Sequence, residues 1–308
     1  MAAVTAGMVK ELREMTGAGM MDCKKALSAV DGDMDKAVEF LRENGMAKAA
    51  KKAGRIAAEG IVKVVVEGNK AAIVEVISET DFVAKNADFN AYVEAVAAQA
   101  LNTTAADIDA FLAESWAKEP SKTVAEELAS QVAVIGENLK IRRFAQIEEN
   151  NGLVASYIHM GGKIGVLVDV ETDVVNPAIE EMAKNVAMQA AALKPVYTSR
   201  HDVDADYIAK ETEILTIKAK NEKPDANDKI IEGMVKGRVS KELKEICLLD
   251  QVYVKAEDGK QSVGAYVAEV AKANNASIKI KKFVRFETGE GLEKKNEDFA
   301  AEVAAQLQ

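Results

Sequence analysis

Two stretches of this chain repeat the same order of apolar and polar positions. The segment from Gly60 to Asp81 aligns with the segment from Gly152 to Asp173 at a constant offset of 92 residues. Each copy predicts two apolar strands joined by a tight turn, followed by the sequence Glu-Thr-Asp and an alanine-rich helix. We therefore expect a duplicated core, in which the features that both copies share form the scaffold.

The same pattern gives the expected elements of each copy. Ser78 and Asp81 have the spacing of a capping box, which predicts that one continuous helix begins there. The expected elements of the first copy are strands over 61–66 and 71–77 with Gly68-Asn69 between them, a helix to about residue 101, an irregular segment over 102–122 and a helix over 123–139. Those of the second copy are strands over 153–158 and 164–170, with a helix that begins at Asn176-Pro177.

The first 45 residues predict three short helices. Thr5 and Asp33 can cap the first and third of them, and residues 20–30 form the second. Asn44-Gly45 predicts the end of the third helix. Residues 46–59, rich in Ala and Lys, are interpreted as a solvated linker, with phosphate binding as the alternative.

Residues 203–247 carry two amphipathic stretches separated by a polar turn, the pattern of an antiparallel helical hairpin. We expect this hairpin to project as an arm; the alternative is that it packs flat on the core. The expected elements of the remaining tail are a strand over 251–254, a helix over 262–273, a strand over 277–286 and a helix over 296–307.

Together these elements predict an α+β fold with an N-terminal three-helix bundle, a duplicated core of antiparallel sheets and helices, and a projecting antiparallel helical hairpin. At 308 residues, the chain is long for one core. The expected domains are a three-helix unit with its linker at 1–55, a first core repeat at 56–145, a second core repeat at 146–202 and 248–290, the arm at 203–247, and a C-terminal helical module at 291–308.

Composition narrows the classes of function. The chain is 48% hydrophobic and 29% charged, which is typical of a soluble globular protein, and its net charge of −10 argues against a direct nucleic-acid partner. Two cysteines provide no disulfide framework. No apolar run is long enough to span a membrane, and the N-terminus has no signal region, so we expect a cytoplasmic protein with no membrane partner.

The sequence offers little chemistry for catalysis. Two histidines and no Cys-x-x-Cys make a metal site improbable, and glycine-rich phosphate loops and a Ser-His-Asp set are missing. His159, at the tip of the second hairpin, is the one suggestive histidine; an exposed loop residue, a protein contact and a general base are all compatible with it. We expect no catalytic residue, no cofactor and no metal.

Two apolar sites are better candidates for function. Phe82 follows Asp81 at a strand-to-helix junction, and the aligned position of the second copy holds Val174. An aromatic ring that only one copy needs suits an anchor for a partner, whereas a core position is the alternative. Met20 and Met21 are adjacent on a helix and cannot both face inward, so we expect one of them to be available to a partner.

Two long motifs carry a resemblance to a known family. They are the run from Leu12 to Leu27, LREMTGAGMMDCKKAL, and the run from Thr80 to Asn86, TDFVAKN. Shorter matching segments lie at 135–138, at 142–143 and at 286–293. With these motifs in this order, essentially the whole chain resembles the bacterial elongation factor Ts family.

The resemblance implies a function and a fold. Members of that family are non-catalytic guanine nucleotide exchange factors for elongation factor Tu, the GTPase that carries aminoacyl-tRNA to the ribosome. It also implies an N-terminal domain resembling ubiquitin-associated domains and a coiled-coil or dimerisation module, and it admits a homodimer or a heterotetramer with the GTPase. Two alternatives are an enzyme that uses Asp81 or His159 as acid or base, and a passive adaptor that binds through residues 1–45.

Site residues follow from the matching motifs. The resemblance implies that Asp81 and Phe82 enter near the Mg²⁺ and phosphates held by the GTPase and promote GDP release. The full set implied to contact the GTPase is Arg13, Met20, Met21, Thr80, Asp81, Phe82, Val83, Ile135 and His159. The His-Met-Gly-Gly sequence at 159–162 departs from the family's more usual His-Gly-Gly.

Overall fold

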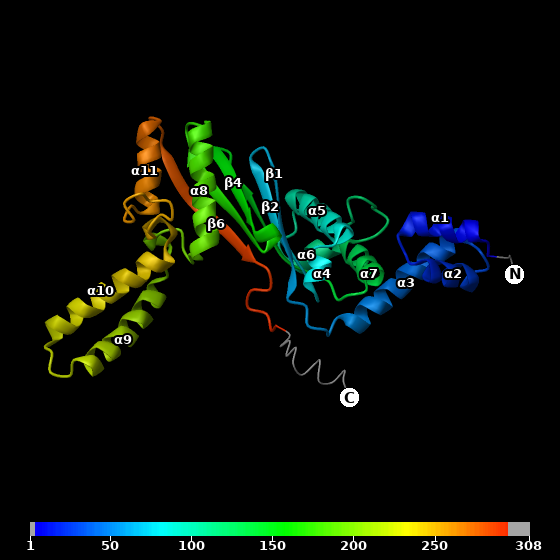
Figure 1. Cartoon of the computed structure of the whole chain (residues 1–308), viewed down its shortest axis with the longest axis horizontal. Helices are drawn as coiled ribbons and strands as arrows, with labels where there is room; N and C mark the ends of the chain where they lie inside the picture. Colours follow the sequence, from blue (N-terminus) through cyan, green and yellow to red (C-terminus); the bar gives the residue numbers. More distant parts are fainter. Residues whose placement is uncertain (1–3, 295–308) are drawn as a thin grey trace.

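The computed structural model of this chain describes residues 4–294. Two three-stranded antiparallel sheets form its centre, in the orders β1-β2-β3 and β4-β5-β6. Figure 1 shows a three-helix unit at one end of the molecule, the two sheets with their covering helices in the middle, and a helical hairpin at the other end. The expected α+β fold class is confirmed.

Each sheet belongs to one copy of the repeat. The elements of the first copy are β1 Glu59–Glu67, β2 Lys70–Ser78, α4 Asp81–Ala84, α5 Ala87–Asn102, α6 Ile108–Ala113, α7 Val124–Ile135 and β3 Lys140–Glu148. Those of the second are β4 Gly152–His159, the 3₁₀ turn η1 Met160–Gly162, β5 Ile164–Thr172, α8 Pro177–Leu193, η2 Arg200–Asp202, α9 Ala205–Glu222, α10 Asp228–Ile246, η3 Leu248–Asp250, α11 Val263–Ala273 and β6 Ile278–Glu287.

The two sheets pack face to face through apolar side chains. Val62 and Ile73 of the first sheet share a buried cluster with Leu167 of the second. Gly165 makes the closest approach, because a Cβ atom there would lie 2.5 Å from a methyl carbon of Val62. The outer faces are covered by α5 on the first sheet and α8 on the second, so the core has four layers.

The strand register corrects the expected alignment of the copies. Gly60 pairs with Ile77 in the first sheet, whereas Gly152 pairs with Glu171 in the second. Residues of β5 therefore lie 94 positions after their counterparts in β2, because the second hairpin turn has two more residues than the first. The constant offset of 92 is wrong beyond that turn, and Val174 is not the counterpart of Phe82.

The helices that follow have yet another offset. Buried positions of α5 such as Phe89 and Val96 correspond to Ile179 and Val186 of α8, 90 residues later. The offset falls from 94 to 90, so the first copy holds four extra residues between strand and helix. This insertion corresponds in length to α4, a single helical turn at Asp81–Ala84.

The expected capping box at Ser78 and Asp81 is wrong, as is the continuous helix. Thr80 is the N-cap of α4 and accepts a hydrogen bond from the Val83 N–H. The chain then breaks, and the Asn86 side chain caps α5 by accepting from the Phe89 N–H. The two consecutive N-caps, Thr80 and Asn86, each change the direction of the backbone. The turn α4 between them therefore lies outside the repeated scaffold.

In the second copy a helical arm is inserted between α8 and η3. It consists of α9 and α10, whose small common core includes Ala219, Ile231 and Val235. Figure 1 shows it projecting from the end of the molecule, so the alternative of flat packing is wrong. Residues 251–254 are not the expected strand; they form a loop with a single bridge from Val252 to Ser262.

The N-terminal unit contains α1 Ala6–Thr16, α2 Met20–Ala29 and α3 Met34–Lys52. The expected stop at Asn44-Gly45 is wrong, because α3 continues through it. Gly45 is buried, with the Ala129 carbonyl of α7 3.6 Å from where its Cβ would lie, so its missing side chain permits close helix packing. The likeness to ubiquitin-associated domains and the domain boundaries remain predictions.

The helix expected over 296–307 lies outside the described residues. Within residues 4–294, no helix is both long and apolar enough to cross a membrane. In the same range, no cluster of His, Cys, Asp and Glu side chains has the arrangement of a metal site. Cys23 and Cys247 are both buried free thiols.

Candidate functional site

The inserted turn α4 presents an exposed aromatic ring. Phe82 is 81% exposed, whereas Ala84 on the same turn is buried. Asp81 and Val83 are half-buried on either side of the ring. The alternative that Phe82 belongs to the core is therefore wrong. Because the second copy builds the same scaffold without this insertion, the ring is available to a partner.

Asp81 is an ionised and paired carboxylate. Its Oδ2 accepts a hydrogen bond of 2.6 Å from the Lys85 ammonium group, one helical turn later. This hydrogen bond holds the pKa of Asp81 below its usual value, with a smaller electrostatic contribution from Lys163. An Asp in this state is a poor general acid at neutral pH, which argues against the enzyme alternative at this position.

A carboxylate that the sequence does not single out anchors the start of the insertion. Oε2 of Glu137 accepts the backbone N–H groups of Glu79 and Thr80 at 3.0 and 3.1 Å. Its Oε1 accepts the Thr80 hydroxyl at 2.6 Å. The Glu79 carboxylate in turn accepts the Asn138 N–H at 2.6 Å. Glu137 lies in the segment at 135–138, one of the segments that match the family. Its pairing with Glu79 and Thr80, almost 60 residues earlier, has no local signal in the sequence.

The three-helix unit presents a second apolar surface at the start of α2. Met20 is 57% exposed and Met21 is 75% exposed. Both methionines are therefore available to a partner, because the helix turns Cys23 and Leu27 inward instead. Arg13 is also exposed, on the preceding helix α1.

His159 lies at the end of β4, where the second hairpin turns. It is exposed, and its Nδ1 is 3.1 Å from the Tyr157 hydroxyl, with the two rings stacked. Lys163, at the far end of the same turn, forms an ion pair with Glu59 of β1 and acts electrostatically on Asp81. The second hairpin turn therefore lies beside the start of the first sheet, on the side of α4.

Ile135 is half-buried at the end of α7, where it packs against the core of the first copy. Its neighbour Val134 is the more exposed of the two, at 44%. The chain then reverses through Gly136, whose φ of 88° is in the left-handed region. Ile135 therefore lies two positions before Glu137, the residue that anchors the start of α4.

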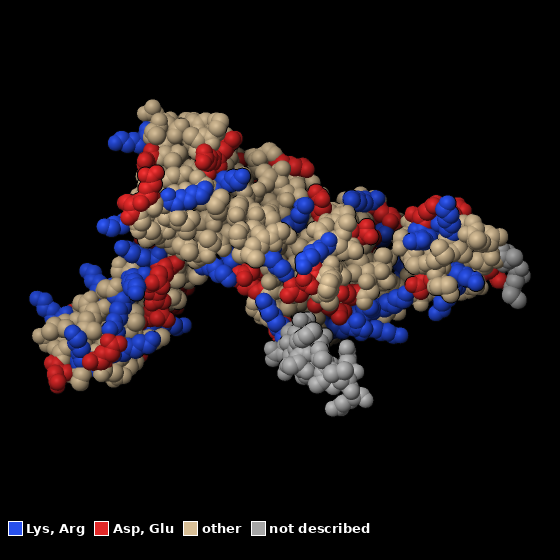
Figure 2. Space-filling model, viewed as in Figure 1, with Lys and Arg blue, Asp and Glu red and all other residues tan. Residues whose placement is uncertain are grey.

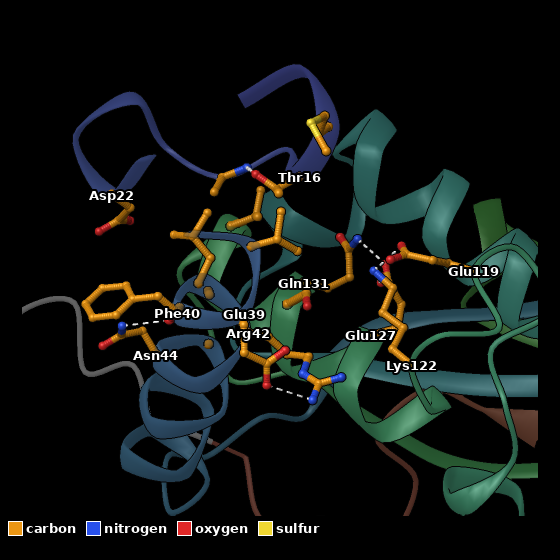
Figure 3. A pocket seen from close by; sticks show the side chains of 18 of the residues that line it. Thr16, Asp22, Glu39, Phe40, Arg42, Asn44, Glu119, Lys122, Glu127 and Gln131 are labelled. Atoms are coloured by element: carbon orange, nitrogen blue, oxygen red, sulfur yellow. Dashed lines mark hydrogen bonds and ion pairs between the residues drawn. The ribbon is translucent and has the colours of Figure 1, made fainter. Parts of the chain in front are cut away.

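A cleft of about 600 Å³ separates the three-helix unit from α7. Figure 3 shows its lining side chains and the contacts among them. Arg42 pairs with Glu39 at 2.9 Å on one wall, and Lys122 pairs with Glu127 at 2.6 Å on the other. These charged groups neutralise one another, so we do not place the functional site here.

The surface charge also bears on the kind of partner. Figure 2 shows acidic and basic side chains interspersed over the face in view, with surface formed by uncharged residues between them. A nucleic-acid-binding face would carry a continuous basic strip. Together with the net charge of −10, this face fits contact with a protein.

Comparison with known proteins identifies the family of this chain. A family model described as Elongation factor TS matches residues 79–290, which include the inserted turn. The chain is 56% identical over 309 residues to elongation factor Ts of Clostridioides difficile (strain 630), with 100% of both chains covered. It is 52% identical over 307 residues to elongation factor Ts of Clostridium botulinum (strain Eklund 17B / Type B), with 99% of each covered. The resemblance found in the sequence is confirmed, and the chain belongs to the elongation factor Ts family of translation elongation factors.

Proposed function

We propose that this chain promotes release of GDP from elongation factor Tu, without making or breaking a covalent bond. One observation carries the proposal: Phe82 is 81% exposed on a four-residue turn that only one of the two repeats contains. A large exposed ring on a rigid support is the kind of side chain that anchors a protein interface. Membership of the elongation factor Ts family supports the identity of the partner.

The physical basis is reciprocal coupling between two ligands of one GTPase. A protein that binds the nucleotide-free form better than the GDP-bound form must weaken GDP binding by the same factor. In such GTPases, backbone amides and Mg²⁺ hold the phosphates. Insertion of Phe82 and Asp81 beside that site would displace the metal or the segment that holds it, and this would remove the largest positive charge near the phosphates.

The magnitude requires more than one contact surface. Accelerating release by about 10⁴-fold corresponds to lowering a barrier by roughly 5.5 kcal/mol. Burial of one Phe side chain supplies about 1.5–3 kcal/mol. Met20 and Met21 offer a second apolar surface, and Arg13 is exposed on the same three-helix unit. We assign these three residues to gripping the GTPase while α4 acts at its nucleotide site.

The remaining site residues support the same interface. Thr80 and Val83 belong to the capped turn that carries Phe82. His159 is exposed at the second hairpin, on the side of α4, and Ile135 lies at the end of α7. We propose that both contact the GTPase near the inserted ring. Neither role requires a cofactor, and the location of such a partner would be the cytoplasm.

Release of a fluorescent GDP analogue from purified elongation factor Tu tests the proposal. The analogue is preloaded, and its dissociation into excess GDP is followed by stopped flow with and without the full-length chain. We expect the chain at micromolar concentration to accelerate dissociation by several orders of magnitude. An unchanged rate at a concentration that saturates a direct binding assay would refute nucleotide exchange.

A further inference from the structure

We infer that Glu137 is a positioning residue for nucleotide exchange: its carboxylate sets the direction in which Phe82 projects. The inference rests on the proposed function, because it names a residue that acts through Phe82. Glu137 is half-buried behind the inserted turn, and we assign it no contact with the GTPase.

Three hydrogen-bond donors converge on the Glu137 carboxylate, and one of them, the Thr80 hydroxyl, also caps α4. The backbone N–H groups of Glu79 and Thr80 and the Thr80 hydroxyl are all within 3.1 Å of its two oxygens. The same Thr80 hydroxyl oxygen accepts the Val83 N–H at 3.4 Å, which closes the first turn of the helix. Glu137 therefore orients the group that caps α4. Hydrogen bonds to an ionised acceptor are stronger than neutral ones.

The insertion needs this support because of its length. A helix of four residues is far too short to be stable by itself in water. Only Ala84 of the turn is buried, so packing beneath it is limited. Val83 packs partly against the core and Asn90 donates to the Ala84 carbonyl at 2.9 Å, and these contacts hold the end of the turn. At its start, the direction of the turn depends on the anchored residues Glu79 and Thr80.

The second copy provides an internal comparison. Val76 pairs with Ile141 in the first sheet, and Val170 pairs with Ile280 in the second. By this register, Asn138 corresponds to Ser277, and both donate an N–H to an acidic side chain: Asn138 to Glu79 at 2.6 Å and Ser277 to Asp173 at 2.7 Å. This tie is common to both copies, so it belongs to the scaffold.

The hydrogen bonds to Glu137, by contrast, are found in the first copy, which is the copy that contains the inserted turn. The same register places Ala276 at the position of Glu137, and an alanine side chain cannot accept a hydrogen bond. The copy that lacks the inserted turn thus also lacks the carboxylate. Because the shared fold forms without either feature, the two together serve what only the first copy does.

The neighbouring residues connect this anchor to the other contact surface. The side-chain amide of Asn138 donates to the Arg55 carbonyl at 2.8 Å, and the Lys52 ammonium group donates to the Gly136 carbonyl. Both partners lie at the end of α3 or just beyond it, where the chain leaves the three-helix unit. The segment from Gly136 to Asn138 therefore holds the exit of that unit and the base of the inserted turn at one place.

The test compares Glu137→Ala and Glu137→Gln with Asp173→Ala as the matched control in the second copy. Exchange on elongation factor Tu is measured over a range of factor concentrations. We expect Glu137→Ala to lower the maximal exchange rate by roughly 10- to 100-fold, close to the loss expected when the contact of the Phe82 ring is removed, with the half-saturating concentration within about twofold of wild type. Glu137→Gln should recover part of the rate, since its amide oxygen still accepts the Thr80 hydroxyl. Asp173→Ala should exchange at the wild-type rate.

A double variant separates positioning from a general structural effect. If Glu137 acts through the ring, Glu137→Ala should slow exchange little further in a Phe82→Ala background. Additive losses would overturn the inference. An unchanged maximal rate for Glu137→Ala would also overturn it, while the proposed function would stand as long as Phe82→Ala is slow.

A second measurement needs no partner. Hydrogen exchange of the Glu79, Thr80 and Val83 amides in the free chain should accelerate in Glu137→Ala and stay at the wild-type rate in Asp173→Ala. Unchanged protection in Glu137→Ala would refute the anchor even if exchange activity had failed for another reason. Glu137→Gln serves both assays if the alanine variant does not fold.

Discussion

Gln99 and Gln189 hold the same position in the two copies of the core and make the same contacts. The Gln99 side chain accepts the Ala117 N–H at 2.9 Å and donates to the Ser115 carbonyl at 2.9 Å. The Gln189 side chain accepts the Val254 N–H at 2.8 Å and donates to the Val252 carbonyl at 3.1 Å. The loops at 115–117 and 252–254 are therefore held by the same pair of hydrogen bonds in both copies, although the arm is inserted only in the second copy.

This relationship predicts that Gln189→Ala is strongly destabilising. Gln189 is fully buried, and its loss leaves the Val254 N–H and the Val252 carbonyl without this partner. Each hydrogen bond of this kind contributes about 0.5–1.5 kcal/mol, so the free energy of unfolding should fall by roughly 1–3 kcal/mol. Urea unfolding followed by circular dichroism measures the change.

Gln261→Ala is the control for that variant. Its side chain donates to Glu269 at the surface, at 2.6 Å. A surface substitution of this kind should change the free energy of unfolding by less than about 0.5 kcal/mol. Equal losses in the two glutamine variants would show that the buried contacts do not secure the loop.

Removal of the exposed ring should separate activity from stability. Phe82→Ala takes away a side chain that the fold does not bury, so the free energy of unfolding should stay within about 0.5 kcal/mol of wild type. Loss of one buried Phe at the interface, about 1.5–3 kcal/mol, corresponds to exchange slowed by roughly 10- to 150-fold. Stopped-flow release of fluorescent GDP measures this rate.

Val175→Ala is the matched control for Phe82→Ala. Val175 is 53% exposed in the strand-to-helix connection of the second copy, where no helical turn is inserted. We expect its exchange rate to equal that of wild type. A Phe82→Ala variant with the wild-type rate would remove the ring from the mechanism.

The methionine surface should contribute affinity. Met20→Ala with Met21→Ala removes two exposed apolar side chains that lie far along the chain from α4. The half-saturating concentration for exchange should rise by about tenfold or more, since 1.4 kcal/mol corresponds to a factor of 10, while the maximal rate stays close to wild type. Met46→Ala, on the exposed side of α3, is the control and should leave both values unchanged. A lower maximal rate at unchanged affinity would contradict the division of roles between the two surfaces.

Local signals explain which elements were predictable from the sequence. The caps at Thr5, Asp33, Asn176 and Ser262 are confirmed, because a side chain that accepts a hydrogen bond three residues later leaves a local pattern. The strands of both hairpins and the helical arm are confirmed for the same reason: their periodicity is contained within each segment.

The predictions are wrong where contacts between residues far apart in the chain determine the local structure. Gly45 has the local signature of a helix end, but its contact with α7 favours continuation of α3. A constant offset between the copies cannot represent both the longer second hairpin turn and the four-residue insertion at α4, because the two change the offset in opposite directions. The Glu137 anchor joins residues that only the folded sheet brings together. Phe82 is exposed as an anchor requires, but the reason is the insertion of α4 and not the expected alignment with Val174.

A buried carboxylate predicts a stability that depends on pH. Asp169 lies at the register position of Glu75, and both are buried. Glu75 is paired with Arg142 and Arg143, but Oδ1 of Asp169 has no hydrogen-bond partner among residues 4–294. Burial, with the neighbouring Glu149, raises the pKa of Asp169 to about 6.

The sign of the effect follows from proton binding. Between pH 4 and pH 6 the folded chain holds a proton on Asp169 that the unfolded chain has lost, so this group lowers the free energy of unfolding as pH rises through that range. Above pH 6 the penalty is constant. Glu149 acts in the opposite sense, because its hydrogen bond with Lys281 lowers its pKa to about 2, and its stabilisation is lost as pH falls below about 4.5.

Asp169→Asn should therefore stabilise the protein at neutral pH. The amide is uncharged and can still donate a hydrogen bond to Glu149, as the protonated acid does. We expect the free energy of unfolding to rise by about 1–3 kcal/mol at pH 7.5, with the gain shrinking through pH 6 and vanishing near pH 4, since one pKa unit corresponds to 1.36 kcal/mol. Urea unfolding of both proteins at each pH measures the change, which includes the response of Glu149 because the two carboxyl groups titrate as a pair. A gain that stayed constant from pH 4 to pH 7.5 would show that Asp169 is ionised in the folded protein throughout, and that its burial imposes no penalty on the charge.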